Sequence, residues 1–166
     1  RTVTGVQTCV LPILTHNDTK INNVMFDDYT GKSVSVIDLD TVMPGTPIYD
    51  FGDQLRTCSG RFAENERDVS KVAVDMEFVA QLTAGYLSTT RDIITRRETE
   101  LLPRSGQLIA LTMGIRFLTD YLQGDTYFRT HRDGENLDRC RAQFALVNSL
   151  ARNQDAIAAL VRQHLQ

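Results

Sequence analysis

The chain has 166 residues and is 42% hydrophobic, which is enough for one domain with a buried core. Its formal net charge is −3 with both signs interspersed, so no basic patch indicates a nucleic-acid partner and no polybasic run indicates a membrane surface. No apolar run approaches the ~20 residues of a membrane-spanning helix, and no secretory signal is recognisable. Cys9, Cys58 and Cys140 lack the spacing of zinc ligands, so reduced thiols in a cytoplasmic protein are expected.

Residues 1–13 show neither helical nor strand periodicity. From Val3 to Ile13 they closely resemble the translation of a common sequencing-library adaptor, with Val10 as the one departure. We therefore expect residues 1–13 to be a non-native segment and residues 14–166 to form the domain. A genuine edge strand is the alternative interpretation of the first segment.

The first chemically informative stretch runs from His16 to Asn23 and reads His-Asn-Asp-Thr-Lys-Ile-Asn-Asn. Two short strand-like runs separated by a turn rich in aspartate and glycine follow, and they predict a β-hairpin over residues 24–37. Asp38 comes directly after it. The hairpin would bring Asp18, Asn23 and Asp38 together in space.

Beyond the hairpin the sequence predicts a mostly helical body. Residues 41–48 contain prolines and a glycine and are expected to form a loop, after which Asp50 is a candidate N-cap of a short helix. Further helices are expected from Glu64 to about residue 86, over 95–102 up to Pro103, over 108–122, over 137–150 and over 155–165. The expected fold class is mainly α with one short β-hairpin.

Phosphoryl transfer needs a carboxylate that deprotonates the acceptor hydroxyl, and oxygen ligands for the Mg²⁺ that bridges the phosphates. Asp18 fits the base, and Asn23 and Asp38 fit the metal ligands. Single Asp or Asn residues in loops are usually turn or cap residues, but the complete pattern is much less common than its parts. His16 is expected to brace the loop. Asp40 is expected either to contact metal or acceptor or to cap the following loop.

This pattern resembles the aminoglycoside phosphotransferase and choline kinase family, which has a protein-kinase-like fold. The family's loop usually carries glycine where this chain has Asn17. The similarity is closer still to the N-acetylhexosamine 1-kinases, and it is carried by residues 16–24, 36–45, 116–128 and 136–141. It extends from residue 15 to about residue 163, which implies the C-terminal lobe of the kinase-like fold with its N-terminal lobe missing.

The resemblance implies phosphorylation of the anomeric hydroxyl of N-acetylglucosamine or N-acetylgalactosamine, with ATP as phosphoryl donor and Mg²⁺ as cofactor. It also implies sugar contacts from Asp18, Arg116 and Tyr127. From the residues alone, Arg116 could instead pair with Asp120 four residues later on a solvated face, and Tyr127 could be a core aromatic. Lys20 is expected near the γ-phosphate or on the surface.

Other residues are expected in structural roles. Asp50 and Asp53 are interpreted as a helix cap and a hydrogen-bond anchor that support the catalytic loop. His131 and Arg132 are expected in a solvated loop.

The sequence contains no glycine-rich phosphate loop and no strand lysine of the kind that grips ATP. We therefore expect this chain alone to be an inactive fragment whose partners are a sugar, a nucleotide and its own N-terminal lobe. One alternative is a kinase of the same fold that acts on an aminoglycoside, choline, homoserine or fructosamine. An aminoglycoside pocket would need more carboxylates after Asp50, and a choline site an aromatic cage, which the absence of Trp disfavours. Another alternative is a non-catalytic, kinase-derived binding module.

Overall fold

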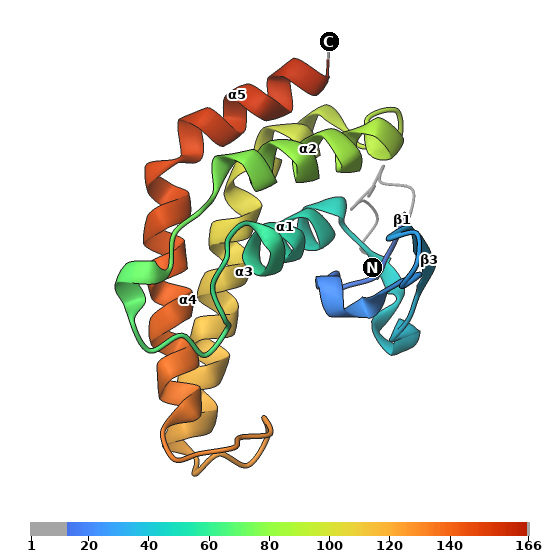
Figure 1. Ribbon diagram of the computed structural model, residues 1–166. Helices are drawn as coiled ribbons and strands as arrows, with labels where there is room; N and C mark the ends of the chain where they lie inside the picture. Colours follow the sequence, from blue (N-terminus) through green and yellow to red (C-terminus); the bar gives the residue numbers. More distant parts are fainter. Residues whose placement is uncertain (1–12, 166) are drawn as a thin grey trace, which may run out of the picture.

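The computed structural model describes residues 13–165. Helices make up most of this part of the chain, and short strands gather at one side (Figure 1). The α-helices are α1 (Pro47–Cys58), α2 (Met76–Thr90), α3 (Arg96–Leu122), α4 (Glu135–Arg152) and α5 (Gln154–His164). Single turns of 3-10 helix lie at Ile21–Asn23, Leu39–Thr41 and Val69–Lys71. The prediction of a mainly α fold is confirmed.

The strands form two separate antiparallel pairs. They are β1 (Ile13–Thr15), β2 (Val24–Phe26), β3 (Ser33–Val36) and β4 (Met43–Gly45). β2 and β3 are the predicted hairpin, but β1 and β4 form a second sheet that was not predicted, and β4 lies within residues 41–48, which were expected to form a loop. The proline and glycine in β4 are typical of loops, which is why the sequence predicted a loop there. In the structure Gly45 allows close approach of the strands, because a Cβ there would collide with Thr15 Oγ1.

The predicted non-native segment, residues 1–13, lies outside the described residues apart from Ile13. Ile13 is the first residue of β1 and is opposite Gly45 in the register of the second sheet. Cys58 and Cys140 are free thiols, and Cys9 lies outside the described residues. Within residues 13–165, no helix combines the length and the apolar character that crossing a bilayer requires.

The helix predicted from Glu64 begins only at Met76. The preceding segment is held in turns by its own carboxylates, which compete with helix formation. Asp68 accepts a hydrogen bond from the backbone N–H of Ser70, and Asp75 caps α2 by accepting one from the backbone N–H of the residue two positions on.

The two helices predicted over residues 95–102 and 108–122 are one continuous helix, α3. Pro103 lies inside it and is buried. Proline normally breaks a helix because it removes a backbone donor and crowds the preceding turn, which is why the sequence predicted an end there. Here Thr95 and Glu98 form a reciprocal capping box at the start of α3, and buried side chains on both sides of the proline hold the helix together.

α1 begins at Pro47 with Thr46 as its N-cap residue, so the prediction that Asp50 is the N-cap is wrong. Proline at the first helical position is favoured because its missing N–H has no intrahelical partner there. Asp50 lies in the first turn instead, where the helix dipole favours a carboxylate. Its side chain is free to bind the segment that precedes the helix.

The helices pack so that α3 runs beside α4 and crosses α1, while α2 lies beside α5 (Figure 1). The core contains residues that are at most 1% exposed, among them Phe51, Leu55, Leu102, Leu146 and Leu150. Gly52 lets α1 and α3 approach closely, because a Cβ there would lie 2.7 Å from Ile109 Cγ1. This contact fixes α1, and α1 in turn positions the loop before the hairpin.

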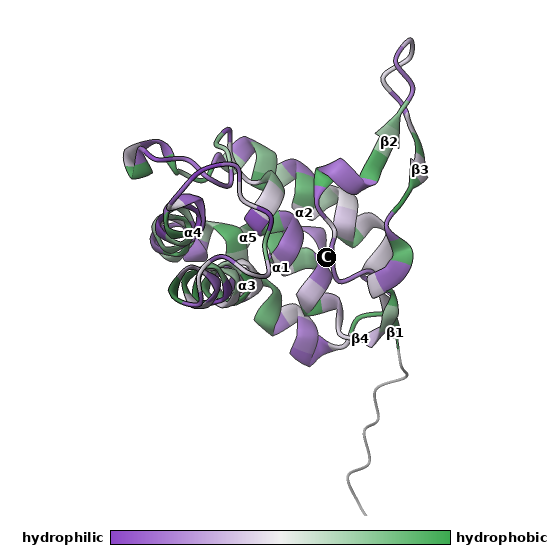
Figure 2. Ribbon diagram, turned by 90° about the horizontal axis from the view of Figure 1, so that it is seen from below, coloured by the Kyte–Doolittle hydropathy of each residue, from purple (hydrophilic) through white to green (hydrophobic). Residues whose placement is uncertain are grey.

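The β2–β3 hairpin projects from the helical body, and Figure 2 shows apolar residues along it. Met25, Phe26 and Val36 are 50%, 48% and 51% exposed. The base of this hairpin, where Asn23 and Ile37 meet, is the part of the sheet nearest to the predicted catalytic residues.

Candidate functional site

The loop between β1 and the hairpin is held to α1 through Asp50. Asp50 Oδ2 accepts a hydrogen bond from the His16 backbone N–H at 2.9 Å, and Asp50 Oδ1 accepts one from the Asn17 backbone N–H at 2.8 Å. The backbone carbonyl of Asp50 also accepts a hydrogen bond from Thr19 Oγ1 at 2.8 Å. The first turn of α1 therefore supports both sides of Asp18.

Asn17 adopts a left-handed conformation with φ of 63°. Glycine takes this conformation most easily, and asparagine is among the side chains that tolerate it best. Hydrogen bonds of the Asn17 side chain offset part of the backbone strain. Its Nδ2 donates to the Thr41 carbonyl at 2.9 Å, and its Oδ1 accepts a hydrogen bond from Thr15 Oγ1 at 3.0 Å. The backbone conformation thus explains why asparagine can stand at a position where the family resemblance leads us to expect glycine.

The Asp18 carboxylate has one engaged oxygen and one that no described residue binds. Oδ2 accepts hydrogen bonds from Lys20 Nζ at 2.7 Å and from Asn23 Nδ2 at 2.9 Å. Partial burial raises the pKa of Asp18, but the hydrogen bonds from Lys20 and Asn23 outweigh it and leave the pKa below 3.8. Asp18 is therefore ionised at neutral pH, with Oδ1 available to accept a proton or a hydrogen bond.

Asn23 is buried at the base of the hairpin, and its amide nitrogen donates both to Asp18 Oδ2 and to the Asp18 backbone carbonyl. Its amide oxygen is thereby oriented away from Asp18. The Ile37 backbone N–H donates to the Asn23 carbonyl at 2.9 Å, which places the next residue, Asp38, beside Asn23. Asp38 is exposed and has a left-handed backbone with φ of 61°.

His16 and Asp40 occupy different surroundings. The His16 ring nitrogen Nε2 lies 3.2 Å from the Ile37 carbonyl, so the ring links the loop to the residue that precedes Asp38. Asp40 is exposed in the turn Leu39–Thr41 and does not line the cavity that opens beside Asp18.

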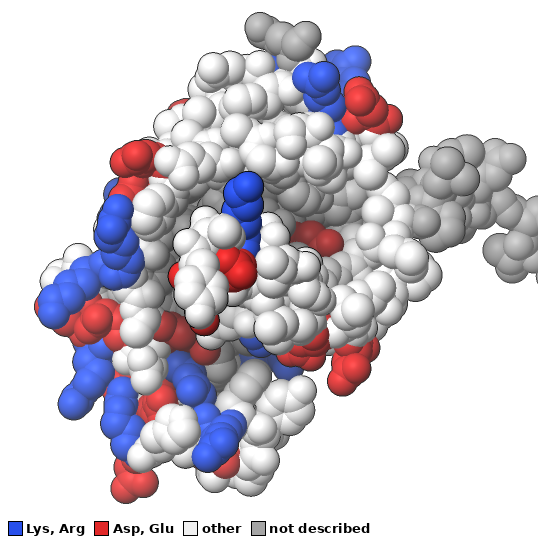
Figure 3. Space-filling view, turned by 45° about the vertical axis from the view of Figure 1, so that its right-hand side comes forward, with Lys and Arg blue, Asp and Glu red and all other residues white. Residues whose placement is uncertain are grey.

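A cavity of about 380 Å³ opens beside Asp18, between α1, α3 and the segment after α3. Its volume lies within the range of sites for small molecules. Charged residues of both signs line it: Asp18, Lys20, Asp53, Arg56, Glu64, Arg116, Arg129 and Arg139. Apolar and aromatic residues, together with Asn17 and Thr41, form the rest of the wall: Tyr49, Ile109, Met113, Phe117 and Phe128. Figure 3 shows a hollow in the surface, with charged side chains of both signs gathered towards the lower end of the molecule.

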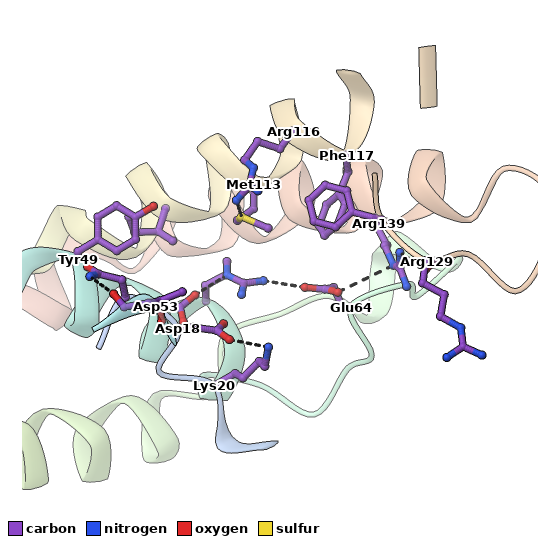
Figure 4. A pocket seen from close by; sticks show the side chains of 15 residues that line it. Asp18, Lys20, Tyr49, Asp53, Glu64, Met113, Arg116, Phe117, Arg129 and Arg139 are labelled. Atoms are coloured by element: carbon purple, nitrogen blue, oxygen red, sulfur yellow. Dashed lines mark hydrogen bonds and ion pairs between the residues drawn. The ribbon is translucent and has the colours of Figure 1, made fainter. Parts of the chain in front are cut away.

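An ionic network that the sequence did not predict crosses this cavity (Figure 4). Arg56 Nε donates to Asp53 Oδ1 at 2.8 Å, and Arg56 Nη1 donates to Glu64 Oε1 at 2.8 Å. Arg139 Nε lies 3.9 Å from the second oxygen of Glu64. Burial lowers the pKa of Arg56, but Asp53 and Glu64 outweigh it and raise the pKa further, so this buried guanidinium stays charged.

The network joins α1, the segment after α1 and α4. The only sequence signal was the i, i+3 spacing of Asp53 and Arg56 on one helix, because the pairing with Glu64 depends on the tertiary fold.

The prediction that Asp53 anchors the catalytic loop is wrong, since the Asp53 carboxylate accepts a hydrogen bond from Arg56 instead.

Arg116 and Tyr127, which are 11 positions apart, lie together at one end of the cavity region. Arg116 Nη2 lies 3.4 Å from the Tyr127 hydroxyl, and the Arg116 guanidinium stacks 5.3 Å from the centre of the Phe128 ring. Tyr127 is 73% exposed and lines a smaller neighbouring cavity that Arg116 shares. Tyr127 is thus not a core residue.

Arg116 does not form the alternative ion pair with Asp120, because the Asp120 carboxylate binds backbone N–H groups of the following loop. Asp120 is 3% exposed and accepts hydrogen bonds from the backbone N–H groups of Thr126, Tyr127 and Phe128. It therefore shapes the loop that presents Tyr127. In the next part of this loop, His131 is exposed and Arg132 pairs with Asp138 at 2.6 Å, and neither residue lines the cavity beside Asp18.

A model described as the phosphotransferase enzyme family matches residues 9–100. The matched range contains the loop around Asp18, both strand pairs, α1 and α2. It ends in the first turns of α3, before Arg116 and Tyr127.

Proposed function

The chain belongs to the phosphotransferase enzyme family, and from this premise we propose that it takes part in transferring the γ-phosphoryl group of ATP to the anomeric hydroxyl of an N-acetylhexosamine. The observation that carries the proposal is the arrangement around Asp18. One carboxylate oxygen is fixed by Lys20 and Asn23, and the other is free beside a cavity of small-molecule size. A general base needs this combination of fixed orientation and open access.

In the proposed reaction, Asp18 Oδ1 accepts a hydrogen bond from the acceptor hydroxyl and takes its proton. The hydroxyl oxygen forms a bond to the γ-phosphorus while the bond between that phosphorus and the β–γ bridging oxygen breaks, and ADP leaves with the bond's electrons. Lys20, at 2.7 Å from Asp18, supplies positive charge where the transferring group is negative.

The described residues offer oxygen donors that fit Mg²⁺. The Asn23 amide oxygen is left free because the amide nitrogen is bound to Asp18, and the exposed Asp38 carboxylate follows the residue that pairs with Asn23. No group of three or more His, Cys, Asp or Glu residues within 13–165 is arranged to hold a metal, but Mg²⁺ commonly takes only one or two protein carboxylates and keeps its waters. When bound, the ion would neutralise charge on the phosphates.

The charge of the cavity favours a neutral acceptor. Five basic and three acidic side chains line it, so a polycationic aminoglycoside or a choline cation would meet an excess of positive charge. A sugar offers hydroxyl groups that match charged donors and acceptors, and C–H faces that pack on aromatic rings. Arg116 and Tyr127, lying together, are proposed to hold the sugar ring from α3 and from the loop after it.

ATP also needs a phosphate grip that the sequence lacks, since no glycine-rich loop or strand lysine is present. We propose that this grip is supplied by another part of the protein and that the 166-residue chain alone is a poor catalyst. A non-catalytic binding module stays the second candidate, because it would share the acceptor cavity.

The experiment that tests the proposal supplies the full-length protein with ATP, Mg²⁺ and each of N-acetylglucosamine, N-acetylgalactosamine, an aminoglycoside and choline, and measures ADP release. Turnover on the N-acetylhexosamines supports the proposal, and turnover on another acceptor alone contradicts the acceptor assignment. Sugar binding without turnover on any acceptor would favour the binding module.

A further inference from the structure

A second cavity of about 360 Å³ lies directly beside the one that holds the proposed acceptor hydroxyl. The two cavities share Lys20, Arg56 and Glu64 in their walls. Of these residues Lys20 contacts Asp18 itself, and Glu64 comes from an exposed segment with its side chain 44% exposed. The Arg56–Glu64 ion pair thus lies between the two cavities and forms part of the wall of each.

Gln143 on α4 lines the second cavity and is 1% exposed. Its Oε1 is buried and has no hydrogen-bond partner among the described residues. Buried side-chain amides are almost always bonded, so an unpartnered one at a cavity wall indicates a group that arrives from outside. The nearby hydroxyl of Thr57 does not serve Gln143, because it donates to the Asp53 carbonyl at 2.8 Å.

The remaining wall of this cavity is partly apolar. Ile21, Phe62 and Ala63 line it together with Thr57. The unpartnered Oε1 needs a hydrogen-bond donor, and the N–H of a secondary amide supplies one. The N–H and C=O of a trans secondary amide point in opposite directions, so the Gln143 carboxamide would bind the N–H and not the C=O. A small apolar surface next to this hydrogen bond accommodates a methyl group. Lys20, Asn22, Arg56 and Glu64 form the polar side of the cavity. An acetamido substituent would find in it an acceptor for its N–H and apolar contacts for its methyl group.

The position of the cavity fits the same substituent. In an N-acetylhexosamine, the acetamido group is attached to the carbon next to the anomeric carbon, so it must lie close to the reacting hydroxyl. A site for it has to begin at the residues that surround Asp18, and Lys20 and Arg56 belong to both cavities. We propose that the second cavity is the acetamido subsite of the acceptor and that the Gln143 carboxamide binds the amide N–H of the substrate. This inference rests on the proposed function.

Gln143→Leu tests the proposal, because leucine has a similar volume and removes the amide group. The measured quantity is the ratio of kcat/KM for N-acetylglucosamine to kcat/KM for glucose in the full-length protein. We expect this ratio to fall at least about tenfold, mainly through KM for the acetamido sugar, with turnover on glucose retained. Gln54→Leu is the matched control, since Gln54 is half-buried on α1 and lines a different cavity.

An unchanged ratio in Gln143→Leu overturns the subsite while leaving the sugar-kinase proposal standing. Equal kcat/KM for glucose and N-acetylglucosamine in the wild-type protein would also overturn the subsite and leave the sugar-kinase proposal standing. A wild-type protein that phosphorylates no hexose at all overturns the proposed function and the subsite together.

A second measurement does not depend on how the variant folds. Saturation-transfer NMR on the wild-type protein with N-acetylglucosamine is expected to give the strongest saturation at the acetyl methyl protons, because they would lie against Phe62 and Ala63. Saturation confined to ring protons would contradict the subsite.

Discussion

Replacing Asp50 by asparagine is expected to loosen the loop that carries Asp18 while leaving the helical core intact. Asp50 accepts one backbone N–H on each carboxylate oxygen, from His16 and Asn17. Hydrogen bonds to a charged group contribute roughly 1.5–3 kcal/mol each. Asparagine keeps one acceptor oxygen and turns an NH₂ group towards the other N–H, so about one of these bonds is lost. The free energy of unfolding should therefore fall by about 2 kcal/mol.

The effect on activity should be larger than the effect on folding, because a displacement of about 1 Å at a catalytic group can cost about 100-fold in rate. Urea unfolding of the chain measures the first quantity, and kcat of the full-length protein measures the second. Asp28→Asn is the control, since Asp28 is exposed in the hairpin turn. If Asp50→Asn changed neither quantity more than the control, the reasoning that α1 positions Asp18 would be wrong.

Three further predictions concern other parts of the site and fold. Lys20→Met removes a hydrogen bond that lowers the pKa of Asp18, so the acid limb of a plot of kcat/KM against pH should shift to higher pH, and an unmoved limb would contradict the coupling. Gly52→Ala should destabilise the chain by about 1–3 kcal/mol in urea, because the new Cβ would press on α3, whereas Gly85→Ala, with open space around it, should be neutral or stabilising. Arg116→Lys should raise KM for the sugar more than it lowers kcat, because lysine cannot reproduce the planar guanidinium; an unchanged KM would exclude Arg116 from sugar binding.

Several features of the fold could be predicted from the sequence because they depend on local chemistry. The hairpin follows from its turn residues, and the ends of α4 and α5 agree with the predicted helices to within about two residues. The hairpin was expected to bring Asp18, Asn23 and Asp38 together. The structure places Asn23 Nδ2 2.9 Å from Asp18 Oδ2.

The remaining features depend on contacts between distant parts of the chain. Pro103 reads as a helix end in sequence, but packing on both sides of it keeps α3 continuous. Glu64 reads as the start of a helix, but it pairs with Arg56 and Arg139, which come from other elements. Gln143 gives no signal in sequence, because an amide on a helix becomes informative only when its burial and lack of a partner are known.

The most direct test of the central claim compares wild-type protein with Asp18→Asn for ATP-dependent phosphorylation of N-acetylglucosamine and N-acetylgalactosamine. Asparagine keeps the shape of the side chain but cannot take the proton from the acceptor hydroxyl. The account predicts sugar-1-phosphate formation by the wild-type full-length protein and a loss of at least about 100-fold in kcat in the variant, with sugar binding retained. Equal rates for the two proteins would contradict the role of Asp18 as the base.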